Sequence, residues 1–302
     1  MSKNNFYSIR NVIVVLLAAI TLIIGIVGLL SDAFKEIKSV FSEDETVLDS
    51  DSYVEMFDVG QGDSILLYSN GKSALIDTGI KSCADDICKK LKSAGISKLD
   101  LLLITHNHDD HMGGIVDVTE RIDVKNLIIP DLAKTDERTD RMELSIQNVK
   151  SAGGKCYTAK QGMSVKVGSF EITILGCYYD EKDENDRSVI SMAKVGKWKF
   201  LFTGDAGESA EEKLMADNIN IDCDVLKVGH HGSMYSTSEE FLEKCSPAFA
   251  MISCGRGNRY SHPHDVVLMR LNDAGVQFWR TDLNGDITFS ITEKEIFVST
   301  DK

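Results

Sequence analysis

The sequence predicts an α/β sandwich, with helices outside two sheets, preceded by one N-terminal transmembrane helix. Short apolar runs typical of strands occur in mixed order with helical patterns between them, which indicates a layered α/β domain. A second observation is an uncharged apolar run at residues 12–30. The expected division is a membrane anchor at 1–31, a linker at 32–51 and a globular domain at 52–302.

The apolar run at 12–30 is long enough to cross the hydrocarbon core of a bilayer as a helix. A buried core helix is the alternative, but a helix that is apolar on all faces is difficult to bury at the extreme N-terminus. Lys3 and Arg10 precede the run, whereas charges of both signs follow it. The positive-inside rule therefore predicts a single-pass protein of the cell membrane, with its globular domain outside the cytoplasm.

The globular domain is expected to open with a strand from Tyr53, a glycine turn and a second strand at 64–68. Asn70-Gly71 then predicts a hairpin to a return strand at 73–77. The remaining expected helices are 84–94, 115–121, about 136–151, 208–216, 237–244 and 265–274. The remaining expected strands are 99–104, 126–129, 155–158, 164–167, 170–175, 189–195, 198–202, 225–228, 249–253, 276–280, 286–291 and 295–299.

The composition limits the classes of partner. A length of 302 residues with 43% hydrophobic residues suffices for a substantial core. The formal net charge of -14 is unusual for a protein that grips nucleic acid by its phosphates, and suits small substrates at least as well. The 7 cysteines include no CxxC pair, so we expect reduced, mostly buried thiols rather than a cysteine zinc site. Cys83 and Cys88 are close enough in sequence for a local disulfide.

Histidines and aspartates gather just past the ends of the expected strands. All 7 histidines fall into three clusters, and a polar loop rich in histidine would not explain that grouping. Side chains two apart in extended backbone point the same way, so His106 and His108 can converge on one cation, and Asp110 and His111 on a second. Imidazole and carboxylate groups suit zinc or manganese, so these two cations are expected to be divalent ions of that type. The clusters are His106/His108/His111, His230/His231 and His262/His264.

Three stretches resemble signatures of the metallo-β-lactamase superfamily. They are His106-x-His108-x-Asp110-His111, the turn Leu75-Ile76-Asp77-Thr78-Gly79 and the strand end Phe202-Thr203-Gly204-Asp205. The resemblance covers about residues 52–300 and implies a metallo-β-lactamase-like αββα sandwich. Four further stretches resemble the hydrolase domain of ComEC-type DNA-uptake (competence) proteins: Asp58-Val59-Gly60-Gln61-Gly62-Asp63, Lys227-Val228-Gly229-His230-His231-Gly232-Ser233, Ser253-Cys254-Gly255 and Asn258-x-Tyr260-Ser261-His262-Pro263.

The resemblance implies roles for individual residues. Asp205 is expected to bridge the two metals, and Asp110 is expected to ligate one of them and to accept a proton. His230 is expected to complete the second site, whereas His231 is either the alternative ligand or the donor to the leaving oxygen. The expected metal ligands are therefore His106, His108, Asp110, His111, Asp205 and His230, the catalytic residues Asp110 and His231, and the substrate-binding residues Ser233, Asn258, Tyr260 and His262.

Several of these expectations have open alternatives. Ser233, Asn258, Tyr260 and His262 would otherwise serve only in loop hydrogen bonding, and Lys227 is expected to have a packing or surface role. Residues 112–229 contain no histidine, although many members of the superfamily carry one there. Asn185, water or His262 would then complete the first site. Asp58, Asp63, Asp77 and Asp109 are expected to support turns or ligating histidines, or, for Asp109, to face solvent.

Together these features predict a membrane-anchored, metal-dependent hydrolase, a phosphodiesterase that uses a metal-bridging hydroxide. The expected substrate is nucleic acid or a cell-wall ester of the phosphocholine type, as in the teichoic-acid phosphorylcholine esterases that the sequence also resembles. No organic cofactor is expected, and β-lactam hydrolysis is not expected because the branch motifs differ. The alternative is a non-catalytic, metal-stabilised surface binding module linked to DNA uptake. A structural zinc site tends to be closed by four protein ligands. The expected ligand set here is larger than that, which favours the enzyme over the binding module.

Overall fold

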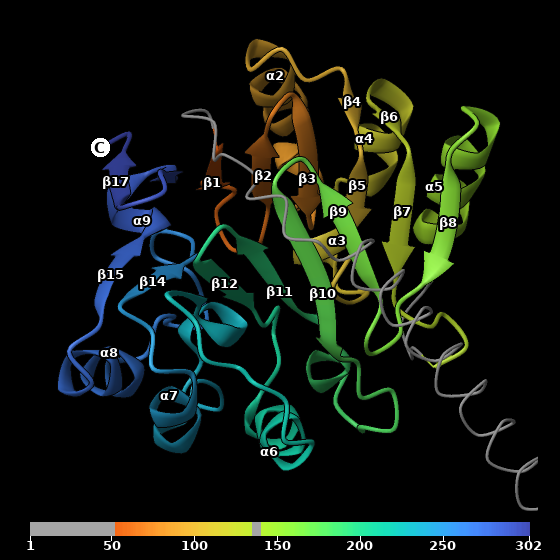
Figure 1. Ribbon diagram of the computed structural model, residues 1–302. Coiled ribbons are helices and arrows are strands. Elements are labelled where there is room, and N and C mark those ends of the chain that lie inside the picture. The colour runs from red at the N-terminus through yellow and green to blue at the C-terminus, as the bar shows by residue number, and fades with distance from the viewer. Residues whose placement is uncertain (1–51, 135–139) are drawn as a thin grey trace, which may run out of the picture. The chain divides into compact units, whose positions relative to one another are not determined.

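The computed structural model describes residues 52–134 and 140–302. The membrane helix expected at 12–30 and the whole of the expected linker at 32–51 lie outside the described residues. Within the described ranges, no helix combines the length and the apolar character that a membrane span requires. The strands of these ranges form two large sheets and one small one (Figure 1).

The first sheet has eight strands in the order β17-β16-β1-β2-β3-β5-β7-β8. The expected hairpin is confirmed, because Asn70 and Gly71 both have positive φ, as the turn between β2 and β3 requires. The pairs β3·β5, β5·β7 and β7·β8 are parallel, so their carboxyl ends lie at one edge. The strands are β1 (Ser52–Met56), β2 (Ile65–Ser69), β3 (Lys72–Ile76), β5 (Leu101–Leu103), β7 (Asn126–Ile129), β8 (Lys155–Thr158), β16 (Ile287–Ile291) and β17 (Ile296–Thr300).

The second sheet has seven strands in the order β15-β14-β13-β12-β11-β10-β9. From β12 to β15 the neighbouring strands are parallel, and a helix connects each consecutive pair: α6, α7 and α8 in chain order. The strands are β9 (Ser164–Val167), β10 (Phe170–Gly176), β11 (Ile190–Val195), β12 (Trp198–Phe202), β13 (Val225–Lys227), β14 (Phe249–Ile252) and β15 (Gln277–Arg280).

Three hydrophobic clusters define the layers. One contains inward residues of both sheets, such as Phe170, Phe200 and Phe289, and therefore lies between them. A second joins the first sheet to α2, α4 and α5, and a third joins the second sheet to α6, α7 and α8. This order is the expected αββα sandwich. The helices are α2 (Ala84–Ser93), α4 (Ile115–Arg121), α5 (Asp140–Ser151), α6 (Glu208–Ala216), α7 (Glu239–Cys245) and α8 (Asp265–Asp273).

Some short elements were not expected from the sequence. The run predicted as one strand at 99–104 divides at Asp100, since Leu99 pairs in a separate two-stranded ladder, and no element is predicted at the position of α9. Cys83 and Cys88 are free thiols rather than a disulfide. The short elements are β4 (Lys98–Leu99), β6 (Asp123–Val124), α3 (Asp109–Met112), α9 (Thr281–Asn284) and the 3-10 turns η1 (Lys81–Cys83), η2 (Asn185–Arg187) and η3 (Gly229–Gly232).

Candidate metal centre

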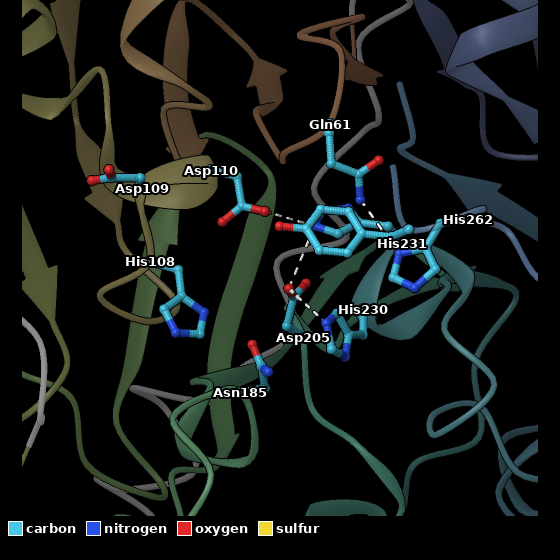
Figure 2. A pocket seen from close by; sticks show the side chains of 10 residues that line it. Gln61, His108, Asp109, Asp110, Asn185, Asp205, His230, His231 and His262 are labelled. Atoms are coloured by element: carbon cyan, nitrogen blue, oxygen red, sulfur yellow. Dashed lines mark hydrogen bonds and ion pairs between the residues drawn. The ribbon is translucent and has the colours of Figure 1, made fainter. Parts of the chain in front are cut away.

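The polar clusters meet in one open pocket of about 370 Å³ (Figure 2). The loops that form it follow β1, β5, β10, β12, β13 and β14, so strands of both sheets deliver their polar ends to the same place. Ligand sites of layered α/β proteins commonly occur at such strand ends. The pocket is lined by Gln61, His108, Asp109, Asp110, Asn185, Asp205, His230, His231, Tyr260 and His262.

Four side chains form the tightest group of metal-binding atoms. Ligand atoms of Asp110, His111, Asp205 and His231 all lie within 4.8 Å of one another. The two imidazole Nε2 atoms of His111 and His231 are 3.3 Å apart. Each faces one oxygen of Asp205, at 3.1 Å from His111 and at 3.4 Å from His231. Their lone pairs therefore converge on one point beside two carboxylates.

The outward nitrogens of these two rings have fixed partners. His111 Nδ1 lies 2.8 Å from Asp77 Oδ2, and His231 Nδ1 lies 3.0 Å from the carbonyl oxygen of Ser253. An acceptor at Nδ1 fixes the proton there and leaves Nε2 free to ligate. The expected supporting role of Asp77 is thus consistent with its contacts.

The other half of the centre contains His106 and His108. His106 Nε2 and His108 Nδ1 are 2.9 Å apart, and Asp205 Oδ2 lies 4.0 Å from the same Nε2. One oxygen of Asp205 therefore faces both groups, as a bridging ligand must. Asn185 lines the same pocket, and its buried Oδ1 atom has no hydrogen-bond partner. An unpaired buried amide oxygen is a ready ligand or water acceptor, so Asn185 suits the position of the missing histidine better than His262 does.

The residues present therefore fit two divalent cations of the zinc or manganese type. The donors are imidazole nitrogens and carboxylate oxygens, which such metals prefer. One group is Asp110, His111, Asp205 and His231. The other would consist of His106 and His108, which adjoin Asp205, with Asn185 from the lining of the same pocket.

Without metal, the carboxylates and imidazoles of the tighter group stabilise each other as ions. Burial alone raises the pKa of Asp205, but the charges of His111 and His231 outweigh it and hold that pKa well below its usual value. Burial lowers the pKa of His111, but Asp205 and Asp77 raise it well above its usual value.

The geometry reverses the expected order of the adjacent pair His230 and His231. Both residues have left-handed backbone, with φ of 47° and 55°, which turns their rings in different directions. His231 is 1% exposed and belongs to the ligand group, whereas His230 Nε2 lies 3.9 Å from Asp205 and the side chain is 27% exposed. His231 is therefore the better ligand, and His230 faces the open pocket (Figure 2).

The turn that carries these histidines is held by Glu211 of α6. The Glu211 carboxylate accepts hydrogen bonds from the backbone N–H groups of Thr237 and Ser238, at 2.5 and 3.0 Å. Thr237 Oγ1 in turn accepts from the N–H of Gly229, where the turn begins. The conformation of the turn therefore depends on a buried carboxylate outside the pocket.

A pH-dependent stability follows from Glu211. Burial raises its pKa to about 7, from 4.5, despite the Ser238 and Thr237 amides. The folded state then binds more protons than the unfolded state between these pH values, so stability falls with rising pH by up to about 1.4 kcal/mol per unit. Glu211→Gln cannot ionise and should lack this slope, although one amide loses its acceptor, at a cost of about 1 kcal/mol. Urea unfolding at pH 5 and 7.5 measures both effects, and parallel pH profiles of wild type and variant would contradict the assignment.

The four expected substrate-binding residues divide into two pairs. Tyr260 and His262 line the pocket. Ser233 and Asn258 do not line it, and their contacts match the loop-bonding alternative: Ser233 Oγ accepts from the N–H of Tyr235, and Asn258 Nδ2 donates to the carbonyl of His262 at 2.6 Å. Asn258 thus shapes the loop that presents the other two residues.

The contacts of three further residues decide between open alternatives or add a residue to the site. Asp109 is exposed and pairs with Arg141, so the solvent-facing alternative describes it. Gln61 was not among the expected site residues, although it lies in the Asp58–Asp63 motif; its Nε2 is 3.4 Å from His262 Nδ1. Lys227 is not on the surface, because its side chain is 0% exposed.

Comparison with known proteins is consistent with this site. Residues 57–158 match the metallo-beta-lactamase superfamily. ComE operon protein 3 of Bacillus subtilis (strain 168) is 32% identical over 80% of this chain and 33% of that protein. Competence protein ComA of Neisseria gonorrhoeae is 30% identical over 82% of this chain and 33% of that protein. The metallo-beta-lactamase fold protein YhfI from Bacillus subtilis has a TM-score of 0.53 at 12% identity, covering 82% of this chain and 100% of that one.

Residues 57–158 are thus similar to the metallo-β-lactamase superfamily, and a protein named for competence, ComA, is among the chain's relatives. The resemblance inferred from the motifs is thereby confirmed, and so is the sandwich fold. The chain spans about a third of the length of the curated relatives that it matches.

Proposed function

We propose that the protein is a metal-dependent phosphodiesterase whose metals are held by the two ligand groups of the pocket. The observation that carries this proposal is the convergence of Asp110, His111, Asp205 and His231 within 4.8 Å at the wall of an open pocket. Divalent metals at such a site polarise phosphoryl oxygens and lower the pKa of water towards neutrality. Two metals, zinc or manganese, are the proposed complement.

The chain's own residues supply the remaining functions. Asp110 is the proposed proton acceptor, because its carboxylate is 28% exposed to the pocket while Oδ2 lies 3.5 Å from His231 Nε2. Burial alone raises the pKa of Asp110, but the hydrogen bond from His231 and the charge of His111 lower it, which keeps the carboxylate ionised. His230, which faces the pocket, takes the role of proton donor to the leaving oxygen that was expected of His231.

The open side of the pocket favours an enzyme over a metal-stabilised binding module. A structural zinc site is closed by its four protein ligands. Here one ligand is exposed to a pocket large enough for a phosphodiester group, and Gln61, His230 and His262 face the same space. A binding module without turnover remains the second candidate, and the experiment below separates the two.

Nucleic acid is the proposed substrate in preference to a phosphocholine ester. Tyr260 is 47% exposed at the pocket, and its ring stacks on His262 with centroids 5.6 Å apart and planes at 24°. The guanidinium carbon of Arg259 lies 4.8 Å from the centre of the Tyr260 ring. A cation already over this ring opposes a quaternary ammonium group, whereas it attracts a phosphate, and the ring itself can stack with a base.

Removal of the Tyr260 ring should weaken nucleic-acid binding. Stacking of one base on an aromatic side chain contributes about 1–3 kcal/mol, so Tyr260→Ala should raise KM for a single-stranded oligonucleotide by about 5- to 150-fold. Tyr260→Phe keeps the ring and is the matched control, with KM close to that of the wild type. Steady-state kinetics measure both variants. Equal KM values for Tyr260→Ala and wild type would exclude a stacking role.

A direct test compares substrates on the full-length chain. We expect metal-dependent cleavage of a single-stranded oligonucleotide, inhibited by chelator and restored by zinc or manganese, and little cleavage of p-nitrophenyl phosphocholine. The opposite preference would favour the cell-wall esterase. Tight oligonucleotide binding without cleavage under any of these metals would favour the binding module.

The cellular setting is also a proposal. An N-terminal anchor at residues 12–30 would hold the domain at the outer face of the cell membrane, and the name of one relative, ComA, connects such a domain with competence. A role in DNA uptake would therefore place a nuclease where incoming DNA arrives.

A further inference from the structure

The ammonium group of Lys227, at the end of β13, lies in the interior behind the metal centre. The side chain is 0% exposed, and Nζ is 2.7 Å from Asp63 Oδ2. Nζ also donates to the carbonyl oxygens of Val228 at 2.9 Å and Gly204 at 3.4 Å. Burial of a charge is costly unless the charge is paired and hydrogen-bonded. The ion pair with Asp63 and the two carbonyl acceptors offset this cost for the Lys227 ammonium.

Asp63 connects this buried ion pair to the metal-binding histidines. Its Oδ1 atom is 3.4 Å from His231 Nδ1, and its Oδ2 atom is 3.9 Å from His111 Nδ1. These are the ring nitrogens that point away from the ligand group. The hydrogen bond of His231 Nδ1 goes to the carbonyl oxygen of Ser253, and the Asp63 carboxylate lies beside the same nitrogen as an electrostatic partner that favours a proton there.

The positive charge of Lys227 also accounts for a second cluster of carboxylate and imidazole atoms in the interior. Ligand atoms of Asp63, Asp77 and His111 lie within 4.8 Å of one another, as they would around a cation. The ammonium of Lys227 is already bonded to Asp63, so a positive charge of the chain itself is present there. Gly204, which accepts from the same ammonium, immediately precedes Asp205.

We propose that Lys227 and Asp63 are positioning residues of the metal centre. Lys227 holds Asp63 against His231, so that the Nε2 atom of that ring faces Asp205, and it holds the turn that delivers Asp205. This inference rests on the metal binding of the proposed function, but it concerns affinity for the metal and not the reaction.

Metal affinity and folding stability together test this role. The variants are Lys227→Met, Asp63→Asn and the double variant, with Lys199→Met as control, because Lys199 lies on the neighbouring β12 and its ion pair with Asp222 is exposed. Each single variant should lose about 10- to 100-fold in zinc affinity, as is typical for partners of ligating side chains. The double variant should recover thermal stability, because no charge is left unpaired, but not zinc affinity. Lys199→Met should keep wild-type affinity.

Recovery of zinc affinity together with stability in the double variant would show a merely structural ion pair and overturn the inference. Unchanged affinity in the single variants would also overturn it. If the single variants do not fold, the double variant alone decides between these outcomes. Affinity is measured by titration without substrate, so a chain that binds zinc but hydrolyses nothing would refute the proposed activity while leaving this inference standing.

Discussion

Substitution of Asp205 by alanine is expected to remove phosphodiesterase activity and most of the bound metal. Its two oxygens face His111 at 3.1 Å and His231 at 3.4 Å, and one of them is 4.0 Å from His106. Loss of this residue therefore affects both ligand groups. Activity should fall by more than about 100-fold, since even a partner of a ligand typically contributes 10- to 100-fold.

Two further variants make the Asp205 result specific. Asp205→Asn keeps the size of the side chain but not its charge, and should lose activity almost as fully. Asp222→Ala removes an exposed aspartate that pairs with Lys199, and should retain both metal and activity. Metal content and initial rates are measured on the same preparations. Full activity of Asp205→Ala would exclude Asp205 as a bridging ligand.

The second large effect separates two adjacent histidines. His231→Ala should lose tightly bound metal, because the Nε2 atom of His231 belongs to the ligand group. Activity should fall by more than about 100-fold, since removal of a ligand costs more than removal of a residue that only supports a ligand. His230→Ala should keep its metal and lose the contribution of a proton donor, about 10²- to 10⁴-fold in kcat, so that metal content rather than activity separates the two variants.

This pair is its own control for backbone strain. His230 and His231 both have positive φ, so alanine is disfavoured at either position, and a difference in metal content reflects the rings alone. Metal analysis of the two variants after dialysis is the measurement. Metal loss in His230→Ala with retention in His231→Ala would restore the order expected from the motif.

Most of the fold could be predicted because its elements have strong local signals. The β2–β3 hairpin is encoded by Asn70-Gly71, β5 is a continuous apolar run, and β12 is apolar except at Lys199. The ladder of β4 and β6 was missed because two-residue strands are too short to show a period. The structure of the N-terminal run lies outside the described residues and stays a prediction.

The residues of the site could be predicted from the sequence, but the directions in which their side chains point could not. The histidine clusters and the family resemblance together identified the residues that gather at the strand ends, whereas the ring directions of His230 and His231 depend on left-handed backbone that no local pattern specifies. Lys227 was expected to pack or to lie at the surface because charged side chains are rarely buried. Its burial depends on Asp63, which another strand end supplies from far away in the chain.

The most direct test of the central claim is metal stoichiometry of the full-length chain, measured alongside its hydrolysis of a single-stranded oligonucleotide. We expect close to two divalent metals per chain after dialysis, turnover that disappears with chelator and returns with zinc or manganese, and neither in Asp205→Ala. A chain that retains no metal, or that holds metal but cleaves no phosphodiester with zinc or manganese, would contradict a metal-dependent phosphodiesterase.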